Sequence, residues 1–157
     1  MKKINKKYFE TLILFFVFSL FSLKTFANEN AIFLTLKNSE VNLRQGPSFE
    51  YPIKLTYKKK YLPVKVIDKV ETWRKVKDLE NNSGWIHISQ LSKKKTAINV
   101  KNDSLLYKKP TIYSEPIAKL EIGRLVLIKK CKLKWCKIAS GNYVGWIFKD
   151  SLWGKIK

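Results

Sequence analysis

The run GWIHISQL at Gly84–Leu91 returns 61 residues later as GWIFKDSL at Gly145–Leu152. Both runs place glycine, tryptophan and isoleucine in a row and reach a leucine at their eighth position. A spacing of this size exceeds the unit of the smaller solenoids and suits one small domain. The echo therefore predicts that this chain of 157 residues holds two copies of one domain.

Other landmarks recur in the same order on both sides of the echo. They are Leu43–Ser48 with Leu106–Thr111, Pro52 with Pro116, Val64 and Val66 with Val126 and Ile128, Trp73 and Val76 with Trp135 and Ile138, and Leu91 with Leu152. A shared order over so many landmarks indicates an internal duplication. The polar run SKKKT at 92–96 lies between the copies and is typical of a linker.

The pattern after residue 27 favours an all-β fold. Short apolar runs alternate with polar residues, and turn-forming clusters such as QGPS at 45–48 separate them. Five or six short strands in about sixty residues cannot form a stable open sheet, so each copy is expected to curl into a small closed barrel or two packed layers. We predict a first barrel over residues 28–92, a linker over 93–96 and a second barrel over 97–157.

The motifs resemble the bacterial SH3-like domain family. The run VNLRQGPS at 41–48, Trp73 with a valine three residues on, and the closing Gly-Trp-Ile with its leucine carry the likeness. The second copy departs at its start, where LYKKPT at 106–111 lacks the asparagine, arginine and glycine; its end resembles the second domain of exported tandem SH3-like proteins of Gram-negative bacteria. The resemblance implies two tandem five-stranded barrels that bind cell-wall peptides, other proteins or an unknown ligand.

The N-terminus has the three parts of a secretory signal peptide. Four lysines within residues 2–7 precede an apolar run at Leu12–Leu23, and Ala27 ends a small-residue cleavage site. The apolar run has twelve residues, whereas a membrane span needs about 20. We expect cleavage after Ala27, a periplasmic or secreted mature chain, and membrane contact only during export.

The chain is strongly basic, with a formal net charge of +20. Residues 1–27 hold five of the lysines and one glutamate, so the rest of the chain carries +16. A basic body suits an anionic partner. Only three basic residues are arginine, the residue preferred for bidentate phosphate recognition. Lysine-rich composition and surface solubility therefore remain an alternative explanation.

The sequence does not carry the motifs of an enzyme, a metal site or a cofactor site. His87 is the single histidine, and paired carboxylates, phosphate loops and metal-ligand spacings are missing. We predict a non-enzymatic protein without metal or cofactor, and His87 as a surface or structural residue.

Cys131 and Cys136 are predicted to form a disulfide. In an exported protein two cysteines this close usually pair across a hairpin; a catalytic dithiol is the alternative. Direct pairing of the cysteines conflicts by one residue with the register that sets Ile128 opposite Ile138. A bulge near Lys129-Lys130 would reconcile the two registers.

Aromatic residues and one arginine are the candidate ligand-binding residues. In the first copy they are Arg44, Phe49, Tyr51, Trp73 and Trp85, and in the second Tyr113, Trp135 and Trp146. The alternative for the aromatic residues is core packing, and for Arg44 it is hydrogen bonding to carbonyls that holds the loop closed. The first copy is expected to carry most of the binding, and the second to act as a support or docking surface.

Three functions follow from these features. The first is a non-enzymatic periplasmic module that recognises peptides of peptidoglycan or of an envelope protein. The second is a structural or assembly protein that docks on an envelope complex without a small ligand. The third is a binder of single-stranded nucleic acid or another anionic polymer, although nucleic acid is not expected outside the cytoplasm. The oligomeric state is left open.

Overall fold

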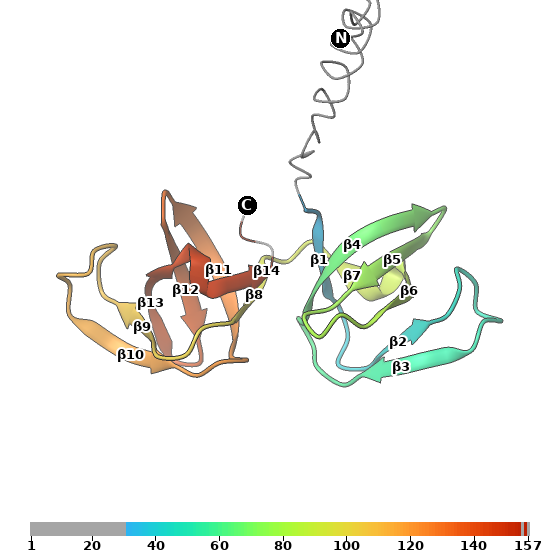
Figure 1. Cartoon of the computed structure of the whole chain (residues 1–157), viewed down its shortest axis with the longest axis horizontal. Helices are drawn as coiled ribbons and strands as arrows, with labels where there is room; N and C mark the ends of the chain where they lie inside the picture. The colour runs from blue at the N-terminus through green and yellow to red at the C-terminus, as the bar shows by residue number, and fades with distance from the viewer. Residues whose placement is uncertain (1–30, 155, 157) are drawn as a thin grey trace, which may run out of the picture. The chain divides into compact units, whose positions relative to one another are not determined.

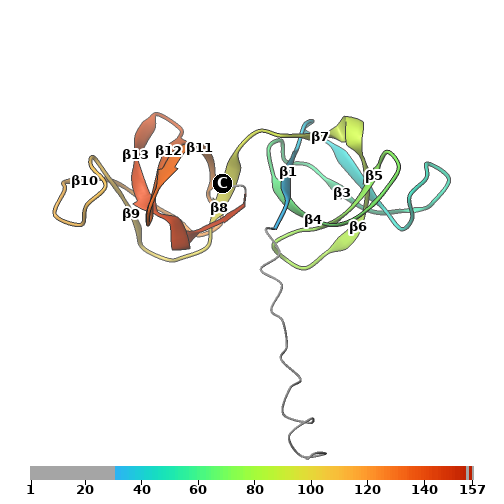
Figure 2. The same ribbon diagram turned by 90° about the horizontal axis from the view of Figure 1, so that it is seen from above.

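The structure, a computed structural model, describes residues 31–154 and 156. The predicted signal peptide and its cleavage site at Ala27 lie outside the described residues. Residues 31–157 form one compact unit that contains both copies. Figure 1 and Figure 2 show two curled sheets in this unit, one formed by each copy.

The two sheets have seven strands each and the same topology. The first contains β1 (Phe33–Leu36), β2 (Val41–Arg44), β3 (Ile53–Tyr57), β4 (Pro63–Val70), β5 (Trp73–Lys77), β6 (Ser83–His87) and β7 (Leu91–Ser92), in the order β3-β2-β6-β5-β4-β1-β7. The second contains β8 (Thr96–Asn99), β9 (Ser104–Tyr107), β10 (Pro116–Leu120), β11 (Leu125–Lys132), β12 (Trp135–Ser140), β13 (Tyr143–Phe148) and β14 (Leu152–Gly154), in the order β10-β9-β13-β12-β11-β8-β14. The repeated order confirms the predicted pair of tandem all-β domains.

Helical structure in the described residues is limited to two single turns, η1 (Ile88–Gln90) and η2 (Lys149–Ser151). Neither turn is long and apolar enough to cross a bilayer. Each leads into a very short strand, β7 or β14, which pairs with β1 or β8. Each sheet therefore has two strands more than the five-stranded barrel that the family resemblance implies, and this short strand is one of them.

Strand alternation builds a separate core inside each sheet. Val41 and Leu43 of β2 are buried, whereas Asn42 between them is exposed, because successive side chains of a strand point to opposite faces. The first core consists of Leu36, Val41, Leu43, Tyr57, Val64, Val76, Ile86 and Leu91. The second consists of Ala97, Leu106, Leu120, Val126, Ile128, Cys136, Ile138, Ile147 and Leu152.

A bulge in the β11–β12 hairpin brings the two cysteines together. Ile128 pairs with Ile138, and after a register shift Cys131 pairs with Cys136. The disulfide between these cysteines is present. Both the predicted bond and the predicted bulge near Lys129-Lys130 are therefore confirmed. The first hairpin has the same shift between Val66 and Asp68, and it sets Lys69 opposite Arg74, where the second has its cysteines.

One glycine in each copy allows two strands to cross closely. A Cβ on Gly84 would lie 2.6 Å from the Arg44 carbonyl oxygen and 2.7 Å from Leu43 Cγ. A Cβ on Gly145 would lie 2.7 Å from both Leu106 Cγ and the Tyr107 carbonyl oxygen. Real Cβ atoms do not approach backbone this closely, so only glycine fits where β6 meets β2 and β13 meets β9.

The two cores differ in where they bury polar groups. The Tyr57 hydroxyl donates to Asp78 Oδ2 at 3.0 Å in the first copy, whereas Leu120 takes the place of Tyr57 in the second. In the second copy Asn99 is fully buried, and its Nδ2 donates to the carbonyls of Leu120 and Glu121. Hydrogen bonds of this kind offset the cost of burying polar atoms.

The segment between the sheets bonds to the first copy. Thr35 Oγ1 donates to the Lys94 carbonyl at 2.6 Å, and Thr96 Oγ1 donates to the Tyr61 carbonyl at 2.9 Å. Hydrogen bonding from Lys94, together with the charge of Lys60, lowers the pKa of the exposed Tyr61 hydroxyl. Thr96 is buried as the first residue of β8. The predicted domain limits at 92, 96 and 97 remain predictions.

We expect Gly84→Ala and Gly145→Ala each to lower the free energy of unfolding by roughly 1–3 kcal/mol, because the added methyl forces strands apart in a packed core. Urea unfolding of the two variants measures this loss. Wild-type stability in both variants would show that the strand crossings do not require glycine.

We expect Tyr57→Phe to lower the free energy of unfolding by about 1 kcal/mol at neutral pH, because Asp78 loses a donor. Burial, followed by the charge of Asp78 and its hydrogen bond, raises the pKa of Tyr57 far above its usual value near 10. Above about pH 10 the unfolded chain therefore releases a proton that the folded chain keeps, and stability falls as pH rises. The variant lacks this group, so its stability should fall less steeply between about pH 10 and 12. An equally steep fall of the free energy of unfolding with pH in the wild type and the variant would contradict the raised pKa of Tyr57.

Candidate functional site

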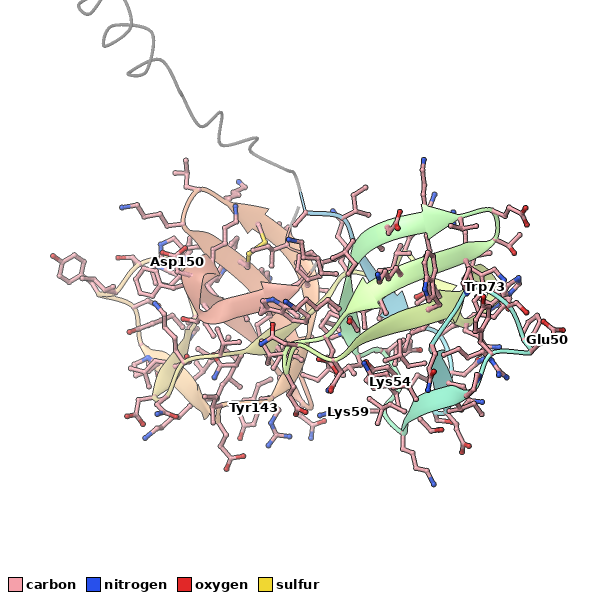
Figure 3. The ribbon with its side chains drawn as sticks, turned by 45° about the vertical axis from the view of Figure 1, so that its right-hand side comes forward. Glu50, Lys54, Lys59, Trp73, Tyr143 and Asp150 are labelled. Atoms are coloured by element: carbon pink, nitrogen blue, oxygen red, sulfur yellow. A yellow bond between two sulfur atoms is a disulfide. The ribbon has the colours of Figure 1, made fainter. Side chains whose placement is uncertain are left out.

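An aromatic cluster stands beside the long β2–β3 loop of the first copy. The ring centres of Phe49 and Trp73 are 4.9 Å apart, and those of Trp73 and His87 are 5.2 Å apart. Phe49 is contributed by the loop, while Trp73 and His87 are cross-strand partners on β5 and β6. Figure 3 shows Trp73 beside the loop that carries Glu50. Three separate segments therefore build one aromatic surface.

Arg44 holds the loop against this surface. Its Nη1 donates to the carbonyls of Phe49 and Tyr51 at 2.9 and 2.7 Å. The guanidinium carbon lies 5.7 Å from the centre of the Phe49 ring. A Cβ on Gly46 would lie 2.5 Å from the Tyr51 ring, so this ring packs directly on the glycine. The loop-holding role considered for Arg44 is thus present in the structure, and it fixes where Phe49 stands.

These residues line a shallow pocket of about 280 Å³, here called the Trp73 pocket. Its lining is Glu40, Val41, Asn42, Arg44, Phe49, Trp73, His87 and Gln90. The Phe49 side chain is 62 % exposed, whereas Trp73 is only 7 % exposed and forms the floor. Arg44 and Glu40 give the pocket one charge of each sign. An aromatic wall with a few polar groups is the usual composition of a binding site.

His87 has a structural partner in this pocket. Its Nδ1 lies 2.8 Å from Ser89 Oγ and accepts a hydrogen bond from the Ser89 amide, and this bond caps η1. Capping requires Nδ1 as an acceptor, which places the proton of a neutral ring on Nε2. The His87–Ser89 contact is therefore local, between residues two apart in the chain.

The second copy has a pocket at the corresponding place, here called the Trp135 pocket because its lining residues Tyr107 and Phe148 pack on Trp135; Trp135 itself does not line it. It has a volume of about 340 Å³. Its lining is Lys101, Asn102, Asp103, Ser104, Leu105, Tyr107, Ile147, Phe148, Asp150 and Ser151. Trp135 stacks on Phe148 with ring centres 4.1 Å apart and meets Tyr107 edge-on at 5.5 Å. Tyr107 and Phe148 thus occupy the places of Arg44 and His87, so this pocket has neither the guanidinium nor the imidazole, and the cation in its lining is Lys101.

The predicted site residues divide into two groups. Arg44, Phe49 and Trp73 meet in the Trp73 pocket, whereas Trp135 stacks on Phe148 without lining the pocket of the second copy. Tyr51 and Trp85 do not line the Trp73 pocket: Tyr51 packs on Gly46, and buried Trp85 lies under Lys75.

In the second copy, Tyr113 and Trp146 lie outside the Trp135 pocket. The Tyr113 side chain is 92 % exposed, whereas Trp146 is buried with Lys130 Nζ at 5.7 Å from its ring centre. The ligand-binding roles assigned to all these residues remain predictions.

Sequence reasoning missed several lining residues. Glu40, Asn42, His87 and Gln90 line the first pocket, and Tyr107 and Phe148 complete the second. One signal was available for His87 and Phe148, because each stands directly opposite the tryptophan of its hairpin. Among the residues that the structure describes, no three His, Cys, Asp or Glu side chains are grouped to hold a metal ion.

Comparison with known proteins shows which family the two copies match. The family model described as bacterial SH3 domain matches residues 37–93 and again residues 100–154. A comparison with curated proteins gives no match.

Two similar solved structures are "Structure of NlpC2 from Trichomonas vaginalis" and "Structure of NlpC1 from Trichomonas vaginalis". The first is 15 % identical over 82 % of this chain and 50 % of that one, with a TM-score of 0.37. The second is 14 % identical over 80 % of this chain and 46 % of that one, with a TM-score of 0.36. The chain thus spans about half the length of these proteins.

We expect Arg44→Met to loosen the β2–β3 loop, because the carbonyls of Phe49 and Tyr51 lose their donor. Hydrogen exchange of the Gln45 amide, which donates to the Pro52 carbonyl across the loop base, should become about tenfold faster. Arg74→Met is the matched control, since Arg74 Nη1 donates to two carbonyls of the β4–β5 hairpin instead. Equal exchange at Gln45 in both variants would show that Arg44 does not hold the loop.

Proposed function

The chain belongs to the bacterial SH3 domain family, and we propose that it is a non-enzymatic binding module that recognises short peptides in the Trp73 pocket. The peptides would belong to the cell wall or to an envelope protein. The observation that supports this proposal most directly is the meeting of Phe49, Trp73 and Arg44 from a loop and two strands around one pocket.

The chemistry of the pocket suits a peptide. An exposed Phe49 ring against the buried Trp73 offers an apolar surface for a side chain. Exposed Glu40 and half-buried Arg44 can face an amino group and a carboxylate of the same short ligand. A volume of about 280 Å³ is at the small end of ligand pockets. Peptidoglycan carries peptides on an anionic polymer, and the basic surface of the chain would favour approach to it.

Binding rather than catalysis is supported by the state of the reactive residues. Both cysteines are joined in the disulfide, so they supply no thiolate. The Nδ1 of His87 is engaged in capping η1. A hydrolase would need a nucleophile, a base and an oriented third group within reach, and the Trp73 pocket offers no such set.

We further propose that the protein works outside the cytoplasm, in the periplasm or secreted. The disulfide supports this, because such bonds persist mainly in oxidising compartments. The signal-peptide pattern of residues 1–27 supports it independently.

A second candidate function is docking on an envelope complex without a small ligand. The observation that favours it is the β9–β10 loop, where Ile112 is 56 % exposed and Tyr113 is 92 % exposed. Exposed tyrosines are common anchors of protein interfaces. This loop lies outside the lining of the Trp135 pocket, so docking here would be independent of peptide binding.

We expect Phe49→Ala to weaken binding to purified peptidoglycan sacculi by about 5- to 30-fold, corresponding to about 1–2 kcal/mol for one aromatic contact. Co-sedimentation with sacculi at two salt concentrations measures this binding. Tyr113→Ala removes an even more exposed aromatic from the second copy and should leave sacculus binding unchanged. A thermal melt confirms that both variants are folded. Wild-type sacculus binding by Phe49→Ala, or equal losses in the two variants, would exclude the Trp73 pocket as the site.

A further inference from the structure

The β11–β12 hairpin presents an apolar side chain at its tip. Leu133 is 94 % exposed and is the first residue of the two-residue turn between Lys132 and Trp135. Its φ of 49° lies in the left-handed region, which leucine adopts at a cost and which asparagine or glycine adopts more easily. Leucine at this place therefore serves neither the core nor the turn.

The first copy shows that the turn does not need leucine. Glu71 occupies the corresponding place, between Val70 and Trp73, with a φ of 44°. The same backbone conformation thus carries a charged residue in one copy and an exposed leucine in the other. The difference lies in what each hairpin presents to its surroundings.

Charge distinguishes the two hairpins in the same way. Residues 129–137, here called the basic hairpin, contain five lysines and no acidic residue, whereas the corresponding residues 67–75 contain three basic and two acidic residues. Both hairpins belong to one lysine-rich chain, so overall composition does not account for the difference. None of the ion pairs found among the described residues includes a lysine of the basic hairpin.

The basic hairpin is held in a defined shape. The Cys131–Cys136 disulfide joins the strands at the residue pair next to the one that flanks the turn. The Lys149 amide donates to the Lys134 carbonyl at 2.8 Å and ties the turn to the neighbouring η2. Figure 1 shows the hairpin extending from its sheet as one end of the second copy. A fixed tip loses little conformational freedom when it binds.

We propose that the basic hairpin docks on an anionic lipid surface, with Leu133 inserted among the lipid chains and the flanking lysines at the headgroups. Lysines near an anionic bilayer each contribute to attraction, and an inserted leucine adds apolar burial. A dissolved polyanion would use the lysines but would gain nothing from an exposed leucine. Leu133 therefore favours lipid over a soluble anionic polymer. This inference does not depend on peptide binding in the Trp73 pocket.

The test uses residues 31–157, which contain both complete cores and form one compact unit. The apolar run at Leu12–Leu23 is omitted because it would bind lipid by itself. Co-sedimentation compares neutral phosphatidylcholine vesicles with vesicles that contain about 30 % phosphatidylglycerol. We expect binding to the anionic vesicles only, weakened when salt rises from about 0.1 M to 1 M, because salt screens exposed charges.

The deciding variant is Leu133→Asn, which keeps the net charge and suits the left-handed turn. It should bind anionic vesicles about tenfold more weakly, because the apolar insertion is lost, while its melting temperature stays equal or rises. Glu71→Asn is the matched control at the corresponding turn and should retain full vesicle binding. Sacculus binding of both variants should stay at the wild-type level, which separates this test from that of the Trp73 pocket.

Two results would overturn the proposal. One is no binding of the wild-type polypeptide to the anionic vesicles. The other is equal binding to anionic vesicles by the wild type and Leu133→Asn. Binding of both proteins to soluble polyglutamate would then identify the hairpin as a purely electrostatic surface for a polyanion.

Discussion

The fold depends on a close approach of two strands at a glycine, where β6 meets β2 in the first copy and β13 meets β9 in the second. Each crossing consists of a single residue pair, Arg44 with Trp85 or Tyr107 with Trp146, and the glycine beside it leaves no room for a side chain. This contact joins the first half of each sheet to the second half. It also decides where the pockets form, because Arg44 and Tyr107 stand at the crossing and face the hairpin that carries Trp73 or Trp135. A wider crossing would move the β2–β3 loop away from its aromatic partners.

The duplicated frame carries different chemistry in its two copies. Tyr107 and Phe148 stand where the first copy has Arg44 and His87, so two rings that pack on Trp135 replace a guanidinium and a capping histidine. The loops are also held differently: Arg44 bonds to loop carbonyls in the first copy, whereas the Lys109 amide donates to Ser114 Oγ in the second. Strand pairing is kept while the side chains around it differ, so the shared fold does not by itself assign both copies the same task.

Much of this architecture was predictable from the sequence. The strands and the bulge beside Cys131 follow from periodicity and register, and the duplication follows from the order of the repeated landmarks. The lining of the pockets was less accessible, because Glu40 and Gln90 reach the Trp73 pocket only through the curl of the sheet. Tyr51 and Trp85 were expected in the site for their residue type, yet one packs on Gly46 and the other is buried beside Lys75. Buried Asn99 was also beyond reach, since its partners Leu120 and Glu121 are distant in the chain.

Asn99 has a further consequence for how the chain folds. Two adjacent domains of the same topology can exchange strands during folding, and such misassembly is a recognised failure of tandem repeats. Asn99 pairs with Leu152 at the place where Leu36 pairs with Leu91. If β8 entered the first sheet, the Asn99 side-chain amide would be buried among the apolar side chains of that core. It would then lack the carbonyls of Leu120 and Glu121 that accept its hydrogen bonds. If β1 entered the second sheet, Leu36 would remove the Asn99 oxygen that accepts from Ser104 Oγ at 2.8 Å and leave this hydroxyl only its longer bond to the Lys101 carbonyl at 3.2 Å. Unpaired buried polar groups are costly, so this one difference between the copies disfavours hybrid barrels and guides each strand to its own sheet.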